Sequence, residues 1–87
     1  MVVHYKTRNS KEVDFVIRKG IIVDSLIQVS YDIGDAKTEK RESAALIEAS
    51  EELNCDNLIL INWDREETKN INGKTIKIIP LWKWLTK

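Results

Sequence analysis

The chain has 87 residues, of which 43% are hydrophobic and 32% charged, a composition typical of a folded domain and not of a disordered segment. Basic and acidic residues number 14 each, so the net charge provides no general electrostatic footprint for nucleic acid. The apolar runs are far shorter than the roughly 20 residues that a membrane span needs, and no secretory signal is visible. A single cysteine excludes an internal disulfide and favours a reducing compartment. We therefore expect a cytoplasmic chain that forms one domain over residues 1–87.

The first third of the chain predicts an antiparallel meander. Segments rich in β-branched residues at 2–7, 12–18 and 21–31 alternate as strands do, and polar turns separate them. In the second of these strands the alternation predicts one apolar face, formed by Val13, Phe15 and Ile17.

The spacing of apolar residues becomes helical from about Lys37 to Leu53, with Asp35 or Thr38 as the N-cap and Asn54 as a left-handed C-cap. The nearly all-apolar segment 57–63 is typical of a strand that is covered on both faces. Because a helix lies between two strands here, we expect a parallel crossover. The apolar face of the helix is predicted to consist of Ala45, Leu46, Ala49 and Leu53.

The last third of the chain begins with a polar stretch that holds one hairpin signal, Asn72-Gly73. A strand at 75–80 follows, and Pro80 ends it before a closing turn or short helix. The elements together predict the α/β class, with a mixed sheet packed by one substantial helix. One helix leaves the second face of the sheet short of cover, so an N-terminal helix, a partner domain or a second copy of the chain is expected there.

Two polar pairs stand out on the predicted hairpin. Glu12 and Asp14 share a face of one strand, and Gln28 and Ser30 share a face of the next, so the hairpin brings the pairs to within about 5 Å. Two carboxylates with a third oxygen ligand are able to hold Mg²⁺, and a lysine beside the metal would stabilise charge on a phosphate. Gln28 is only a neutral ligand, however, and Ser30 supplies no positive charge.

The segment "KEVDFVI…LIQVSYDI" resembles the hairpin of the PD-(D/E)XK nuclease superfamily, in which an Asp on one strand is followed on the next by (D/E)-x-K. More narrowly, "EVDFVI", "VSYDI", "ALIEASEELNCDNLILINWD" and "GKTIKIIPLWKWL" together resemble the C-terminal nuclease-like domain of archaeal and bacterial AAA-type predicted ATPases. The resemblance covers nearly the whole chain. It implies a restriction-endonuclease-like fold that lacks its first helix, and a chain that is a fragment of a longer ATPase.

The resemblance also assigns roles to the polar pairs. Glu12 and Asp14 match acidic positions of the family, while Gln28 stands where the catalytic Glu or Asp would be and Ser30 where the Lys would be. Asp14, Gln28 and Ser30 are thus a degenerate catalytic set, and Glu12, Asp14 and Gln28 a weak Mg²⁺ set. No P-loop is present, so the chain has no ATP site of that kind.

Three functions follow from this interpretation. The leading one is a non-catalytic interaction or regulatory domain, with an ATPase domain in cis or trans, or another copy of the chain, as partner. The alternative is a metal-dependent DNase with an atypical D…QxS motif, in which Lys37 or Lys40 supplies the missing charge. A further alternative is nucleic-acid binding without cleavage, which predicts a steep salt dependence of affinity.

The remaining candidate residues have plainer interpretations. Trp63, Trp82 and Trp84 are expected mainly in core or sheet-edge packing, although Trp82 and Trp84 are also candidates for an interface. Cys55 is expected to be buried and inert, because His4 is the only conventional base in the chain.

Overall fold

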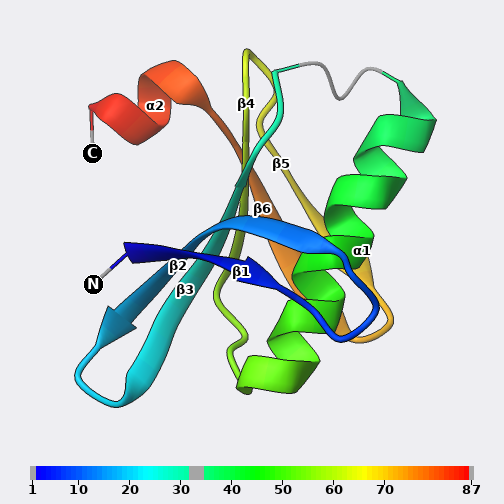
Figure 1. Cartoon of the computed structure of the whole chain (residues 1–87). Coiled ribbons are helices and arrows are strands. Elements are labelled where there is room, and N and C mark those ends of the chain that lie inside the picture. The colour runs from blue at the N-terminus through cyan, green and yellow to red at the C-terminus, as the bar shows by residue number, and fades with distance from the viewer. Residues whose placement is uncertain (1, 32–34, 87) are drawn as a thin grey trace.

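The computed structural model describes residues 2–31 and 35–86, which form a six-stranded sheet and two helices (Figure 1). The strand β3 begins and ends inside the predicted segment 21–31. Residues 32–34, which follow that segment, lie outside the described part of the chain. The elements in chain order are β1 (Val2–Lys6), β2 (Glu12–Lys19), β3 (Ile22–Val29), α1 (Ala36–Leu53), β4 (Leu58–Asn62), β5 (Glu67–Ile71), β6 (Lys74–Pro80) and α2 (Leu81–Leu85).

The sheet is mixed, with the strand order β1-β2-β3-β4-β6-β5. The first three strands form the predicted antiparallel meander, and β4 runs parallel to both β3 and β6. β5 pairs antiparallel with β6 at one edge, and β1 forms the other edge. The α/β class, the meander and the parallel crossover through α1 are therefore confirmed.

The ends of α1 are set by local side-chain and backbone geometry. Asp35 is the N-cap, and its carboxylate accepts a hydrogen bond of 3.0 Å from the backbone N–H of Lys37. Asn54 adopts the left-handed conformation with φ of 54° and donates its backbone N–H to Ser50. Of the two predicted N-caps, Asp35 is thus the one that the structure has.

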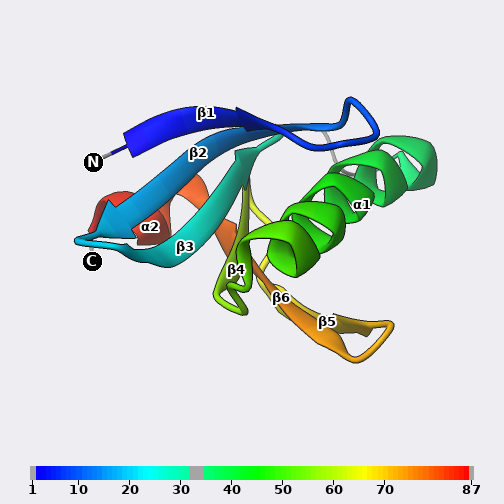
Figure 2. The same cartoon turned by 60° about the horizontal axis from the view of Figure 1, so that its bottom comes forward.

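The two faces of the sheet are covered unequally. Figure 2 shows α1, which has 18 residues, lying along one face, whereas α2 has five residues. The main core lies under α1 and consists of Val13, Val16, Leu26, Ala45, Leu46, Ile47, Ala49, Cys55, Leu58, Leu60, Ile76 and Ile78. On the other face a smaller core of Ile27, Ile59 and Ile61 is packed by Leu81 and Trp84 of α2. The predicted shortage of cover on the second face is present in the structure.

A β-bulge in β2 makes the predicted apolar face of that strand wrong. Between β1 and β2 the register shifts, so that two steps along β1 match three along β2. Val13 belongs to the core under α1, whereas Phe15 and Ile17 line the opposite face. An alternation count from sequence includes no bulge, and a single extra residue transfers the following side chains to the other face.

The sequence prediction missed β5 and overestimated the length of β3. β5 is an edge strand of polar residues, and its side chains alternate between half-buried and exposed. Its turn to β6 is the predicted one, since Asn72 and Gly73 both have positive φ, of 52° and 79°. Within the described residues, neither helix has the length and apolar character needed to cross a membrane.

Candidate functional site

The hydrogen bonding between β2 and β3 changes at the end of the hairpin where the polar pairs lie. Regular backbone pairing between the two strands extends to Phe15 and Ile27 and goes no further toward the start of β2. Beyond that point, side chains of one strand bond to the backbone of the other. The predicted site therefore lies where the backbone ladder has been replaced.

Gln28 forms a bridge between the two strands at this point. Its Oε1 accepts a hydrogen bond of 2.7 Å from the backbone N–H of Asp14, and its Nε2 donates one of 2.7 Å to the backbone carbonyl of Glu12. The residue is only 2% exposed. A carboxamide suits this position because it offers an acceptor and a donor at once. The side chain therefore substitutes for a pair of ladder hydrogen bonds.

Asp14 makes the reciprocal contact. Its Oδ2 accepts a hydrogen bond of 2.9 Å from the backbone N–H of Val29, so each strand sends one side chain to the backbone of the other. The structure thus brings Asp14 and Gln28 together, as the sequence predicts. Both are joined to main-chain atoms and not to each other's side chains.

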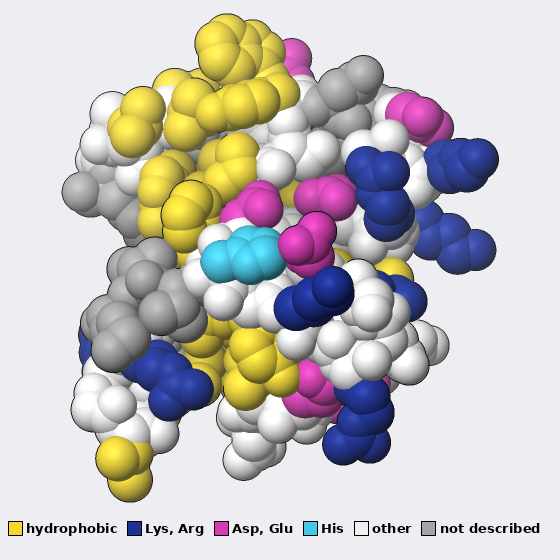
Figure 3. Space-filling model, viewed as in Figure 1, with side chains coloured by type: hydrophobic (Ala, Val, Ile, Leu, Met, Phe, Trp, Pro, Cys, Tyr) yellow, Lys and Arg dark blue, Asp and Glu magenta, His cyan; other side chains and the backbone are white. Residues whose placement is uncertain are grey.

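The other two predicted residues have different surroundings. Glu12 is exposed, and its Oε1 lies 3.4 Å from Nε2 of His4 on the neighbouring strand. In Figure 3 the histidine lies beside acidic side chains on the surface. Ser30 is half-buried just past β3, and its backbone N–H donates to the carbonyl of Ile61 at 2.8 Å, which extends the pairing with β4.

Sequence reasoning missed Glu42, which lies on α1 near Asp14. Burial raises the pKa of Glu42, and the Asp14 carboxylate raises it further, although Arg41 opposes both. Residues 14 and 42 are brought together only by the packing of α1 on the sheet. A signal was present in the sequence: Glu42 precedes Ala45 and Leu46 by three and four positions, so it falls on the apolar stripe of the helix.

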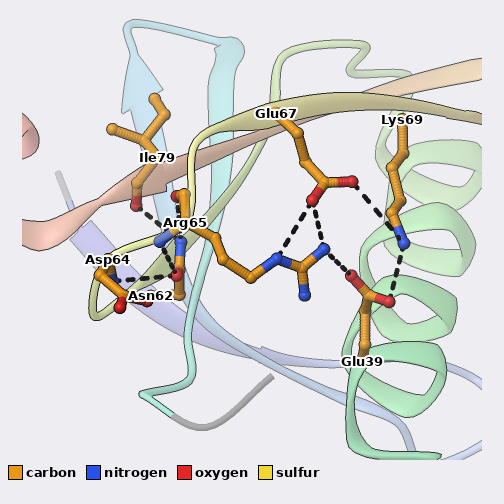
Figure 4. Close-up of polar contacts among 7 residues, drawn as sticks. All are labelled: Glu39, Asn62, Asp64, Arg65, Glu67, Lys69 and Ile79. Carbon is orange, nitrogen blue, oxygen red and sulfur yellow. Dashed lines mark hydrogen bonds and ion pairs between the residues drawn. The ribbon is translucent and has the colours of Figure 1, made fainter. Parts of the chain in front are cut away.

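A second polar cluster joins the first turns of α1 to β5 (Figure 4). Oε2 of Glu39 accepts a hydrogen bond of 2.7 Å from Lys69, and its Oε1 lies 3.1 Å from the guanidinium of Arg65. Glu67 also bonds Arg65. Burial alone would raise the pKa of Glu39, but the two cations lower it below its usual range. The segment from Arg65 to Lys69 is therefore held to the helix by ion pairs.

The turn next to this cluster is organised by Asn62 at the end of β4. Its Oδ1 accepts hydrogen bonds from the backbone N–H groups of Asp64 and Arg65, at 3.2 and 2.6 Å. Its Nδ2 donates to the carbonyl of Arg65 at 2.7 Å. Asn62 is 1% exposed, and its partners are main-chain atoms of the turn and of β6, which is a structural arrangement.

Among residues 2–31 and 35–86, no three His, Cys, Asp or Glu side chains are grouped in a way that would hold a metal ion. Lys37 and Lys40, the two candidates for a displaced catalytic lysine, are exposed on the first turns of α1.

The three tryptophans differ in their surroundings. Trp63 and Trp82 are 63% and 61% exposed, so neither of them is packed in a core. Trp84 is half-buried and packs on the smaller core. Cys55 is buried as expected, and this burial raises the pKa of its thiol.

Comparison with known proteins provides no family assignment. No protein-family model, no curated protein and no solved structure matches the chain.

Proposed function

We propose that the chain is a non-catalytic, nuclease-like interaction or regulatory domain of the kind found at the C-terminus of AAA-type ATPases. The element order supports this proposal. A three-stranded meander, a crossover helix and a parallel fourth strand follow each other as the resemblance implies. Asp14 and Gln28 also face each other across the β2–β3 hairpin, where a nuclease hairpin would hold its acidic residues.

The bridge made by Gln28 is the observation that carries the non-catalytic interpretation. Both polar atoms of the side chain bond to the backbone of β2. If Oε1 turned away to bind a metal, the partly buried N–H of Asp14 would lose its acceptor, at a cost of about 1 kcal/mol or more. In this proposal, the side chain of Gln28 joins the two strands of the hairpin and does not bind a metal.

The missing positive charge supports the same interpretation. Ser30 stands where the family has its lysine, and a hydroxyl provides no charge to stabilise a phosphate in the transition state. In this proposal the hairpin keeps the frame of a nuclease site without its chemistry. The partner that we propose is an ATPase domain, in cis or trans, or another copy of the chain.

One observation favours the alternative, a metal-dependent DNase. The carboxylates of Asp14 and Glu42 lie close enough for the first to raise the pKa of the second. A divalent cation between them would relieve this repulsion, and carboxylate oxygens are the ligands that Mg²⁺ prefers. Such a site would use Glu42 in place of Gln28.

A plasmid-nicking assay with Mg²⁺ or Mn²⁺ tests the proposal directly. We expect the wild-type protein to convert no more supercoiled plasmid than the Asp14→Ala variant. Cleavage by the wild type that is lost in Asp14→Ala would overturn the non-catalytic interpretation.

Calorimetric titration with Mn²⁺ separates the two functions further. The proposal predicts no saturable binding at one equivalent by the wild type. Binding that is abolished by Asp14→Asn and by Glu42→Gln, but retained in the exposed control Asp64→Asn, would establish the alternative site.

A further inference from the structure

The second face of the sheet carries an apolar groove. The groove has a volume of about 310 Å³, and α2 forms one of its walls through Leu81, Trp84 and Leu85. Its remaining walls come from the sheet: Phe15, Ile17, Ile27, Val29, Tyr31 and Ile61. Among the residues that the structure describes, no charged side chain lines it. At this volume the groove is at the lower end of small-molecule sites, so it fits one or two inserted side chains.

Large apolar side chains surround the groove and project from the protein. Phe15 is 43% exposed, Tyr31 59% and Leu85 71%. The ring of Trp63 extends the surface, since it contacts Tyr31 edge to face with 6.2 Å between ring centroids. We call Phe15, Tyr31, Trp63, Trp84 and Leu85 the aromatic surface. Figure 3 shows hydrophobic side chains gathered over α2 and the neighbouring strands.

The extent of the aromatic surface matches one side of a dimer interface. An aromatic side chain presents roughly 150–250 Å² when it is fully accessible, so the exposed fractions give on the order of 500 Å² of apolar surface. A standard interface buries about 800 Å² on each partner, of which about 65% is apolar in homodimers. The apolar portion expected of one homodimer half is therefore also on the order of 500 Å².

The aromatic surface is suited to contact with itself. It offers both a groove and projecting side chains of the size that the groove accepts, which is what a two-fold symmetric contact requires of one surface. The chain has 14 basic and 14 acidic residues, so two copies approach without net repulsion. Trp and Tyr are the residues most often found at the energetic centre of interfaces.

We propose that the aromatic surface binds the same surface of a second copy, which forms a two-fold symmetric dimer and covers the second face of the sheet. This inference rests on the proposed function as an interaction domain and names its partner. It is independent of the catalytic question, because neither Asp14 nor Gln28 is part of the surface.

Sedimentation equilibrium of the full chain over a range of concentrations tests the dimer. We expect a reversible monomer–dimer equilibrium for the wild type. Phe15→Lys and Leu85→Lys should each raise the dissociation constant at least tenfold, because each places an unpaired charge in a dry contact. The matched control is Ile21→Lys, since Ile21 is 96% exposed in the β2–β3 turn and lies outside the surface.

Three outcomes would overturn the dimer: a wild type that stays monomeric up to several hundred micromolar, dissociation by Ile21→Lys, or no effect of the two surface variants. Tryptophan emission is a second readout, and it should shift to the red on dilution of the wild type as Trp63 and Trp84 regain solvent. A monomeric wild type that also fails to cleave plasmid would refute the dimer while leaving the non-catalytic interpretation intact.

Discussion

The carboxamide of Gln28 occupies a position that neither a carboxylate nor an apolar side chain would satisfy. It accepts a hydrogen bond from the backbone N–H of Asp14 and donates one to the backbone carbonyl of Glu12. The side chain is buried from solvent. A glutamate there would keep the acceptor, lose the donor and bury a charge. The structure therefore explains why a glutamine is stable at this position.

The Gln28→Glu variant should lose about 1–3 kcal/mol of unfolding free energy at pH 7, because the carbonyl of Glu12 loses its donor. The burial of the new carboxyl raises its pKa in the folded state. A raised pKa makes the penalty largest at pH values above that pKa, and the penalty shrinks as the pH falls and the protonated carboxyl again donates.

Urea denaturation at pH 7 and pH 4 measures this difference. The control is Ser30→Ala, which should change stability by less than about 0.5 kcal/mol. Equal stability of Gln28→Glu and wild type at pH 7 would show that the bridge is unimportant.

Glu42 provides the second prediction at this scale. Burial raises the pKa of Glu42, and Asp14 adds to this, so the charged form is disfavoured in the folded protein. Glu42→Gln removes that charge and should stabilise the fold by about 0.5 kcal/mol at pH 7. The gain should disappear in acid, since the wild-type carboxyl is then protonated.

Thermal unfolding at several pH values checks the effect of Glu42→Gln. Glu51→Gln is the matched control, because Glu51 is exposed on the same helix and its replacement should be neutral. Destabilisation by Glu42→Gln at pH 7 would contradict the prediction.

At the scale of elements, the edge strand β5 is bonded to β6 by its backbone ladder and to α1 by ion pairs. Glu39 on α1 forms ion pairs with Lys69 of β5 and with Arg65, which lies in the segment before β5 (Figure 4). These contacts lower the pKa of Glu39 despite its burial. A lowered pKa means that the carboxylate stabilises the fold above its unfolded-state pKa, and this stability is lost as the pH falls through the folded-state pKa.

Glu39→Gln should therefore cost about 1 kcal/mol at pH 7, and less in acid. Hydrogen exchange of the β5 amides should accelerate more than that of the buried strand β4, because only the edge hairpin loses an anchor. The control is Glu66→Gln, whose carboxylate bonds Lys83 of α2 and not α1. Uniform acceleration in all strands would mean that the ion pairs support the whole fold and not the hairpin.

For the whole molecule, the main core under α1 is the part whose opening requires global unfolding. Cys55 is a probe of this core, since it is 3% exposed and burial raises the pKa of its thiol. A thiol reagent should modify native protein slowly, and the rate should rise with urea in parallel with the unfolding transition. Rapid modification without urea would show local opening at the C-terminal end of α1, and Cys55→Ser is the control for non-specific reaction.

The local features of this chain were predictable because each depends on a few neighbouring residues. Asp35 and Asn54 end the helix through their own side-chain and backbone preferences, and Asn72-Gly73 turns the last hairpin through positive φ. The antiparallel meander and the crossover to β4 follow from periodicity and from chain connectivity. For the candidate site, the predicted pairing of the hairpin strands did bring Asp14 and Gln28 together, whereas Glu12 lies against His4 of β1.

Other features escaped prediction because they depend on contacts between elements. The bulge in β2 places the side chains of Val13 and Phe15 on opposite faces of the sheet. The bulge is defined by the pairing of β2 with β1, which local sequence does not show. The strand β5 is mostly polar and has no apolar pattern to detect, and its Lys69 is joined to Glu39 of α1 by an ion pair.

The sequence by itself determined the class of fold, the positions of the turns and helix caps, and the pairing of Asp14 with Gln28 across the hairpin. Only the tertiary structure decided what those residues do: Gln28 bonds the backbone of β2, Asp14 bonds the backbone of β3, and Glu42 comes close to Asp14. It also decided that Phe15 and Leu85 belong to one exposed surface. The physical reason is the range of the interactions, since propensity and periodicity act over a few residues, whereas buried hydrogen bonds and surfaces join residues far apart in the chain.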